Sequence, residues 1–182
     1  MYPDVIQYGS LVRCIMIAPT FVDLQGFIVG MKFVVKEVAV LRNETVLAHY
    51  IFTCPMPWSL LTKFDKSCAS WLIRNHHGLR WEDGNVPYSM MKPLITSAVL
   101  GEEEDEDDDE MPTLVYVKGC QKREWLVDLL ENYARKNLTI ETLDADYEDV
   151  ESLNNLDVTN TMRCGKHVKN CALQNVLKIF NW

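Results

Sequence analysis

Residues 32–41 read Lys-Phe-Val-Val-Lys-Glu-Val-Ala-Val-Leu. This run consists almost entirely of apolar and β-branched residues, which is typical of a strand buried on both faces of a sheet. Asn43-Glu44 is a turn signal, and residues 46–53 after it predict the partner strand of a hairpin. Glu37 does not fit an apolar strand, because a buried carboxylate is costly unless it is paired or bound to a metal ion. Lys36 alternates to the opposite face of the strand and is a poor partner for it.

Further elements are predicted on both sides of this hairpin. Before it, residues 12–18 form a short apolar run of strand length. The later elements are, in chain order, a helix over 59–75, a loop over 76–88, a short helix over 89–99, a strand over 113–117, an amphipathic helix over 121–136, a strand over 138–143, a short helix over 150–156 and a helix over 171–180. A hairpin followed by a strand–helix–strand unit implies an α/β fold, in which helices flank a mixed sheet.

Apolar residues at helical spacing are the basis of two of these helix predictions. In the helix over 59–75 these residues are Leu60, Leu61, Phe64, Cys68, Trp71 and Leu72. In the helix over 121–136 they are Trp125, Leu126, Leu129, Leu130 and Tyr133. Helices with one apolar side are expected to lie against the sheet.

The composition indicates one domain. The chain has 182 residues, of which 48% are hydrophobic, and this is enough for a sizeable core. Its net charge of −8 comes from residues 102–110, nine acids in a row, without which 17 acids face 18 bases. Adjacent like charges repel one another and do not pack. We therefore expect a single domain over 1–182 with an acidic loop at about 101–111, which either aids solubility or covers a basic face by mimicking nucleic-acid phosphates.

The sequence shows no signal for a membrane or for secretion. No stretch approaches the roughly 20 apolar residues of a membrane span. The start, Met1-Tyr-Pro-Asp, has no basic region that leads into an apolar one. Reduced thiols are therefore expected for the six cysteines. These observations predict a cytoplasmic or nuclear location, or both, and no membrane partner.

Three residues that zinc prefers as ligands lie close together near the C-terminus. Cys164, His167 and Cys171 follow the spacing Cys-x2-His-x3-Cys, immediately before the last predicted helix. Structural zinc is almost always held by four protein ligands in a tetrahedron. A fourth ligand must therefore come from elsewhere in the fold.

Short segments of the chain resemble the DEDD exonucleases, which have a ribonuclease-H-like fold. The segments that carry the resemblance are 34–40 for their second strand, 115–119 and 125–126 for the strand and helix that carry a later acid, 139–143 and 152–156 for the next strand and short helix, and 172–176 for the final helix. Together they cover nearly the whole chain. The resemblance implies a ribonuclease-H-like mixed sheet flanked by helices.

The acids that define DEDD exonucleases are missing at the matching positions. Hydrolysis with two metal ions needs clustered carboxylates that hold the ions about 4 Å apart. The first strand of the family carries Asp-x-Glu, whereas residues 15–18 read Ile-Met-Ile-Ala and no acid follows until Asp23. Lys122 stands where the middle helix should carry an acid, and Asn175 stands where the last helix has Asp. We therefore expect no ordinary DEDD exonuclease activity.

The residues found instead resemble the maelstrom domain, a degenerate member of this fold in which Glu, Cys, His and Cys bind zinc. Residues 37–40, Glu-Val-Ala-Val, are similar to its second strand, and Cys164, His167 and Cys171 followed by Ala-Leu are similar to its C-terminal motif. The resemblance implies that Glu37, Cys164, His167 and Cys171 bind one structural Zn²⁺, and the expected burial of Glu37 supports this independently. The alternative is an ordinary helix start with an incidental cysteine pair.

Two classes of function follow from this resemblance. The first is a zinc-stabilised, catalytically degenerate exonuclease-fold domain that binds RNA or protein partners in small-RNA (piRNA-type) silencing of transposons. The alternatives are a single-strand RNA endonuclease or a purely structural interaction protein of a mobile element. The basic residues that could contact single-stranded or structured RNA are Lys118, Lys122, Arg123, Arg135 and Lys136. Because they form no strong basic stripe, protein partners are favoured.

Overall fold

The structure is a computed structural model that describes residues 18–101, 112–146, 152–153, 155–156 and 158–181. In this part of the chain, five strands form one sheet in the order β3-β2-β1-β4-β5. The strands are β1 (Thr20–Val29), β2 (Lys32–Arg42), β3 (Val46–Ile51), β4 (Thr113–Val117) and β5 (Leu138–Thr142). The helices are α1 (Lys63–Asn75), α2 (Met91–Leu100), α3 (Cys120–Leu129), α4 (Leu143–Asp146) and α5 (Ala172–Asn181), with short 3-10 helices η1 (Trp58–Leu60), η2 (Tyr88–Met90) and η3 (Ala134–Lys136).

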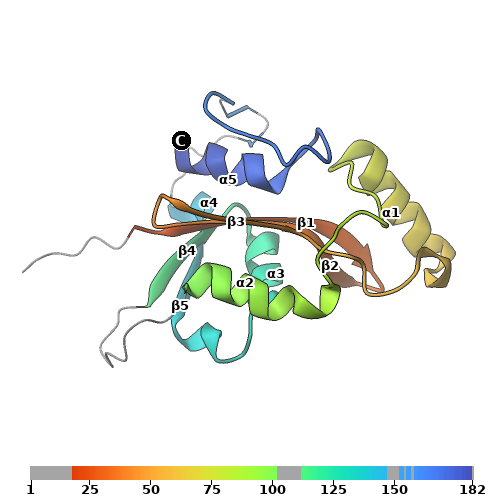
Figure 1. The fold of residues 1–182 in the computed structure, drawn as a ribbon, viewed down its shortest axis with the longest axis horizontal. Coiled ribbons are helices and arrows are strands. Elements are labelled where there is room, and N and C mark those ends of the chain that lie inside the picture. Colours follow the sequence, from red (N-terminus) through yellow and green to blue (C-terminus); the bar gives the residue numbers. More distant parts are fainter. Residues whose placement is uncertain (1–17, 102–111, 147–151, 154, 157, 182) are drawn as a thin grey trace, which may run out of the picture.

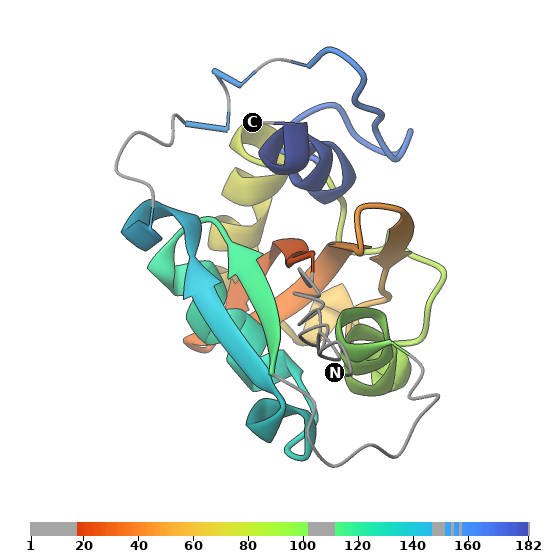
Figure 2. The same ribbon diagram turned by 90° about the vertical axis from the view of Figure 1, so that its left-hand side faces the viewer.

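The sheet is mixed and lies between two layers of helices. Strands β1, β2 and β3 are antiparallel, whereas β4 and β5 run parallel to β1. Helices α1 and α5 cover one face, and α2 and α3 cover the other (Figure 1). The turned view again places α1 and α5 on the same side of the sheet (Figure 2). The largest group of buried apolar side chains lies on the α2–α3 face, and a smaller group joins β2 to α5.

The predicted α/β architecture, a mixed sheet flanked by helices, is confirmed. The β2–β3 hairpin, the strands β4 and β5, and the helices α2 and α5 all lie within two residues of their predicted bounds. Continuous apolar runs produced these predictions. Val115 and Val117 of β4, for example, are fully buried.

The central strand β1 was not predicted. The predicted strand over 12–18 lies, except for Ala18, outside the described residues, and the strand that pairs with both β2 and β4 is Thr20–Val29. Asp23 and Gln25 interrupt its apolar pattern, yet both are buried. Asp23, which was predicted to follow the first strand, therefore lies within a strand. Polar side chains in a central strand need partners from other elements, and a local pattern does not reveal those.

The apolar side predicted for the helix over 59–75 is wrong in part. Three of its residues are more than half exposed in the structure: Leu60, Phe64 and Trp71. Helix α1 turns Asp65 inward instead, because the Asp65 carboxylate accepts a hydrogen bond from the Gly30 N–H at the tip of the β1–β2 hairpin (3.1 Å). Thr62 caps the same helix end by accepting from the Asp65 N–H.

The predicted helix over 121–136 is shorter in the structure. Helix α3 ends at Leu129, because Leu130 has an extended backbone (φ −80°, ψ 152°), and Tyr133 beyond it is 61% exposed. In the region of the short helix predicted over 150–156, the described residues 152, 153, 155 and 156 are not helical. The acidic run 102–110 lies outside the described residues. No helix in the described ranges has the length and apolar character that crossing a bilayer requires.

A close approach of two strands requires glycine at position 26. The pairing of β1 with β2 shifts by one residue between Gln25 and Gly26, as in a β-bulge. A Cβ atom at position 26 would lie 2.3 Å from the Val34 carbonyl oxygen and 2.8 Å from the Phe33 ring. The shift sets Gln25 directly opposite Glu37. It therefore helps to determine which polar side chains lie next to each other on the α5 face.

Gly26→Ala should lower the free energy of unfolding by about 1–3 kcal/mol, the usual effect of forcing extra atoms into a packed site. The control is Gly30→Asn, since Gly30 has a left-handed backbone (φ 52°) with open space around it, and Asn tolerates that conformation. Urea unfolding of both variants measures the effect. Equal losses in the two variants would contradict the steric explanation.

Candidate metal centre

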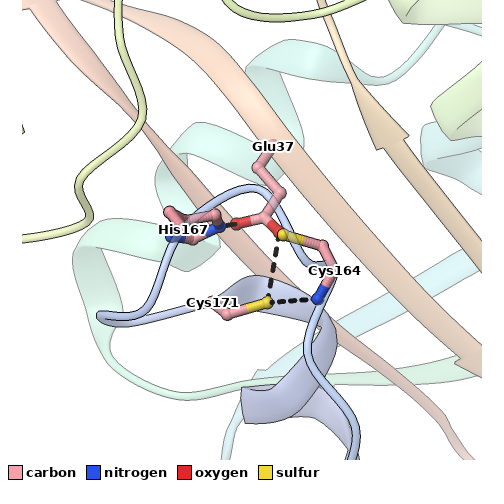
Figure 3. A group of neighbouring side chains, drawn as sticks. All are labelled: Glu37, Cys164, His167 and Cys171. Carbon is pink, nitrogen blue, oxygen red and sulfur yellow. Dashed lines mark hydrogen bonds and ion pairs between the residues drawn. The ribbon is translucent and has the colours of Figure 1, made fainter.

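Four side chains from distant parts of the sequence meet beneath α5. Glu37 comes from β2, Cys164 and His167 come from the loop before α5, and Cys171 directly precedes that helix (Figure 3). Their ligand atoms all lie within 4.8 Å of one another. Glu37 is fully buried, Cys171 and His167 are nearly so, and Cys164 is half-buried. This group, called the metal centre below, could hold a metal ion.

The backbone of the loop before α5 is folded around the two sulfur atoms. Gly165 has a left-handed backbone (φ 76°), which turns the chain back after Cys164. The Lys166 N–H then donates to Cys164 Sγ (3.4 Å), and the Cys164 N–H donates to Cys171 Sγ (3.3 Å). Burial raises the Cys164 pKa, and the Lys166 N–H partly opposes this by stabilising the thiolate, which is the form that binds metal.

The His167 ring has its hydrogen on Nδ1. This nitrogen faces two backbone carbonyl oxygens, of His77 and of Lys169, and a carbonyl can only accept. Nδ1 therefore donates, and Nε2 carries the lone pair. Nε2 is buried, has no hydrogen-bond partner among the described residues, and lies 3.0 Å from Glu37 Oε2. Two lone pairs at this distance repel unless a positive charge, either a proton or a metal ion, lies between them.

The pKa values of the pair indicate the same need for a positive charge. Burial alone would raise the Glu37 pKa, but the ionic contact with His167 and the hydrogen bond with His49 lower the Glu37 pKa to about 2. Burial would likewise lower the His167 pKa, but its contacts with Cys171 and Glu37 raise it to about 11. Without a metal ion, the cluster thus retains a proton on His167. A divalent cation in that place would satisfy the carboxylate and both sulfurs at once.

One distance between two of the ligand atoms can be compared with a tetrahedral site. Cys171 Sγ lies 3.5 Å from Glu37 Oε1. A tetrahedral ion bound to sulfur at about 2.3 Å and to oxygen at about 2.1 Å would separate those two atoms by about 3.6 Å. The Nδ1–H of His167 donates to backbone carbonyls, which is the usual way in which a metal-binding histidine is oriented. The four residues therefore fit a metal ion by donor type and tautomer, and the distance between Cys171 and Glu37 agrees with a tetrahedral site.

His49 is a member of this site that the sequence analysis missed. Its Nε2 lies 2.8 Å from Glu37 Oε1, and the ring is partly exposed. The hairpin register pairs Ala39 with His49, so the histidine lies diagonally across from Glu37. A predicted register for the 32–41 and 46–53 hairpin would have placed the two side chains near each other. His49 thus contacts Oε1, the same carboxylate oxygen that lies near Cys171 Sγ.

Lys36 points away from Glu37, as predicted. Its ammonium group is fully buried on the opposite face and donates to the carbonyls of Trp81 (2.8 Å) and Asp83 and to Cys54 Sγ (3.5 Å). Burial lowers the pKa of Lys36. Lys36 and Glu37 thus have separate partners: the backbone of residues 81–83 binds the Lys36 ammonium, and the residues of the metal centre surround the Glu37 carboxylate.

A second polar cluster lies on the same face of the sheet, around Asp23. The Asp23 carboxylate is fully buried and accepts from the Lys122 ammonium, from Asn175 Nδ2 (2.8 Å) and from Gln25 Nε2 (3.3 Å). Lys122 and Asn175, which the resemblance to the exonucleases places at positions of acids, both donate to Asp23. This group is called the Asp23 cluster. The Lys122 ammonium neutralises the single carboxylate. The cluster therefore lacks the negative charge that binding two divalent ions requires.

The five predicted basic residues do not form one patch. Lys118 pairs with Asp144 (2.7 Å), Lys122 pairs with Asp23, and Arg123 donates to the Ile140 carbonyl (2.6 Å). Lys118 lies in the turn before α3, and Lys122 and Arg123 lie in its first turn. Arg135 and Lys136 are exposed in η3, which follows the other end of that helix. The remainder of α3, which ends at Leu129, lies between the two groups in the sequence.

Comparisons with known proteins give no match. No protein-family model, no curated protein and no solved structure matches the chain.

Lys122→Met would leave the Asp23 carboxylate buried without its cation. Removing one partner of a buried ion pair costs about 3–5 kcal/mol, so the free energy of unfolding should fall by about that amount. Asp23→Asn combined with Lys122→Met removes both charges and should lose less. Urea unfolding of the single and double variants tests this, and a double variant no more stable than Lys122→Met would show that the pair is not coupled.

Proposed function

We propose that Glu37, Cys164, His167 and Cys171 bind one Zn²⁺ ion as a structural centre. The observation that carries the proposal is the buried Nε2 of His167, which has no hydrogen-bond partner among the described residues and faces a carboxylate. Two thiolates, an imidazole and a carboxylate are a donor set that zinc accepts in a tetrahedron. Because four protein ligands complete that tetrahedron, no position remains for a reactive water, and the ion is structural.

The ion would connect α5 to the sheet. Cys171 and Glu37 are 134 residues apart in sequence, so their contact closes a long loop, which is entropically unfavourable in the unfolded chain. Metal binding adds directly to the free energy of folding when the unfolded chain has no preformed site. The Ala172 N–H at the start of α5 also donates to Glu37 Oε2 (2.9 Å), so the position of the carboxylate and the start of the helix depend on each other.

Protein purified without added zinc should contain about one zinc per chain, and a chelator should lower its melting temperature. Cys164→Ala should lose the metal, whereas Glu37→Ala should weaken binding less, since a carboxylate is the poorest of the four ligands for zinc and water can replace it. Cys120→Ala, which changes an exposed cysteine outside the centre, is the matched control. The proposal is contradicted if the protein contains less than about 0.2 zinc per chain, for a site this closed, and if a chelator leaves its melting temperature unchanged. The four residues would then only pack against one another.

We further propose that the chain is a catalytically degenerate, ribonuclease-H-like domain, similar to maelstrom, that binds RNA or protein partners in small-RNA silencing of transposons. The mixed sheet flanked by helices is compatible with that fold. The Asp23 cluster supports the loss of exonuclease chemistry, because Lys122 and Asn175 both donate to Asp23. A neutral cluster of one acid, one ammonium and two amides favours a binding role over two-metal hydrolysis.

Incubation with labelled single-stranded RNA and Mg²⁺ or Mn²⁺ should leave the RNA intact, since the Asp23 cluster lacks the carboxylates that hold two ions. Gel electrophoresis measures the products, and a gel-shift assay on the same samples measures binding. Processive release of mononucleotides that Asp23→Asn abolishes would contradict the proposal. Internal cleavage that is lost with Cys164→Ala, but retained in Cys120→Ala, would instead favour the endonuclease.

A further inference from the structure

A cavity of about 320 Å³ lies beside the N-terminal end of α3. Ligand pockets in proteins typically measure about 300–1,000 Å³, so this one has room for a single small group. Its apolar lining comes from β1, β2, α1 and α3: Leu24, Ile28, Phe33, Leu72 and Trp125. The polar groups on its walls are Gln25, His76, Lys118, Gln121 and Lys122. An apolar floor with a few convergent polar groups is the usual composition of a small-ligand site.

The cavity wall contains a rigid aromatic platform. The rings of Phe33 and Trp125 are stacked, with centroids 3.9 Å apart and planes 1° from parallel. Phe33 comes from β2 and Trp125 from α3, so the stack is fixed between the sheet and a helix. Flat aromatic surfaces of this kind stack with nucleobases, because every base has a π face.

The charges on the wall favour an anion. The lining contains two lysines and a histidine but no carboxylate. Lys122 is engaged by the buried Asp23. Lys118 pairs with Asp144, whose side chain is 44% exposed, and ion pairs with an exposed partner are weak. A phosphate in the cavity can therefore compete with Asp144 for the Lys118 ammonium.

The loop of the metal centre fixes one polar group of the cavity. Asn170 Nδ2 lies 3.3 Å from His76 Nδ1 and donates to the His76 carbonyl (2.9 Å). An amide N–H directed at Nδ1 makes that nitrogen the acceptor, so the ring hydrogen is on Nε2. His76 therefore offers a ligand a hydrogen-bond donor. Asn170 lies between His167 and Cys171 in sequence, which connects the cavity wall to the metal centre.

We propose that this cavity binds a nucleoside monophosphate group, either as a free nucleotide or as the terminal nucleotide of a single strand. The base stacks against the Phe33–Trp125 platform, and Lys118 and His76 bind the phosphate. The inference deepens the binding role proposed above and rests on it, because it names the group that is bound. It does not depend on the identity of the metal.

Isothermal titration calorimetry of the full, metal-loaded chain with AMP, adenosine and inorganic phosphate tests the two halves of the site. AMP should bind at least about tenfold more tightly than adenosine or phosphate, since each of these lacks one half of the contacts. Lys118→Gln removes a charge-assisted hydrogen bond and should weaken AMP binding about tenfold. Asp144→Asn breaks the same ion pair but keeps the ammonium, so it should leave AMP binding unchanged or tighter.

A 5′-phosphorylated single-stranded RNA tetramer distinguishes the two sources of the group. Tetramer binding about tenfold tighter than AMP binding assigns the strand end, and equal affinity assigns the free nucleotide; Lys118→Gln must weaken binding in both cases. The proposal is overturned if neither AMP nor the tetramer binds at millimolar concentration, if phosphate binds as tightly as AMP, or if Lys118→Gln and Asp144→Asn behave alike. Each of these failures leaves the zinc content unchanged, whereas failure of the proposed function appears as missing zinc or as nuclease activity.

Discussion

The buried carboxylate of Glu37 is the constraint on which the C-terminal part of the fold depends. Its strand, β2, lies between β1 and β3 and is covered on both faces, so the charge has no access to water. Its partners are His49 of β3, the loop residue His167 and the first N–H of α5, at Ala172. None of these groups is near Glu37 in sequence. The strand can therefore be buried only when the hairpin, the loop and the helix have all reached their places, which makes this part of the fold cooperative.

The two carboxylates on this face of the sheet are satisfied in different ways, and the difference separates their roles. Asp23 has an ammonium and two amides from the chain itself, so its cluster is complete without an ion. Glu37 has histidines and thiols around it, and one buried imidazole nitrogen there has no hydrogen-bond partner among the described residues. Gln25 and Glu37 are direct neighbours across β1 and β2. Asp23 of β1 is thus neutralised by the Lys122 ammonium from α3, whereas Glu37 of β2 belongs to a group that could hold a metal ion.

The sequence predicts best where one local pattern decides the structure. Continuous apolar runs located β2 and β4, and the spacing of Cys164, His167 and Cys171 indicated three of the four donors of the metal centre. The prediction failed at β1. Asp23 is paired there with Lys122 and Asn175, and Gly26 lies against the Val34 carbonyl, so the pattern of β1 depends on residues remote in sequence. It also failed on α1, where a hydrogen bond from Gly30 turns Asp65 inward and leaves Phe64 exposed. In each failure the partner is remote in sequence, so no periodicity could report it.

Helix α5 and the loop before it join the three polar sites of this structure. Ala172 donates to Glu37, and Asn175, one turn later, donates to Asp23. Asn170, just before the helix, holds His76 at the wall of the cavity. A metal ion that fixes Cys164, His167 and Cys171 therefore also fixes the start of α5 and the direction of Asn170. Since a structural ion limits the motion of the groups that bind it, the metal centre would keep the cavity preformed, and preformed sites lose less entropy when a ligand binds.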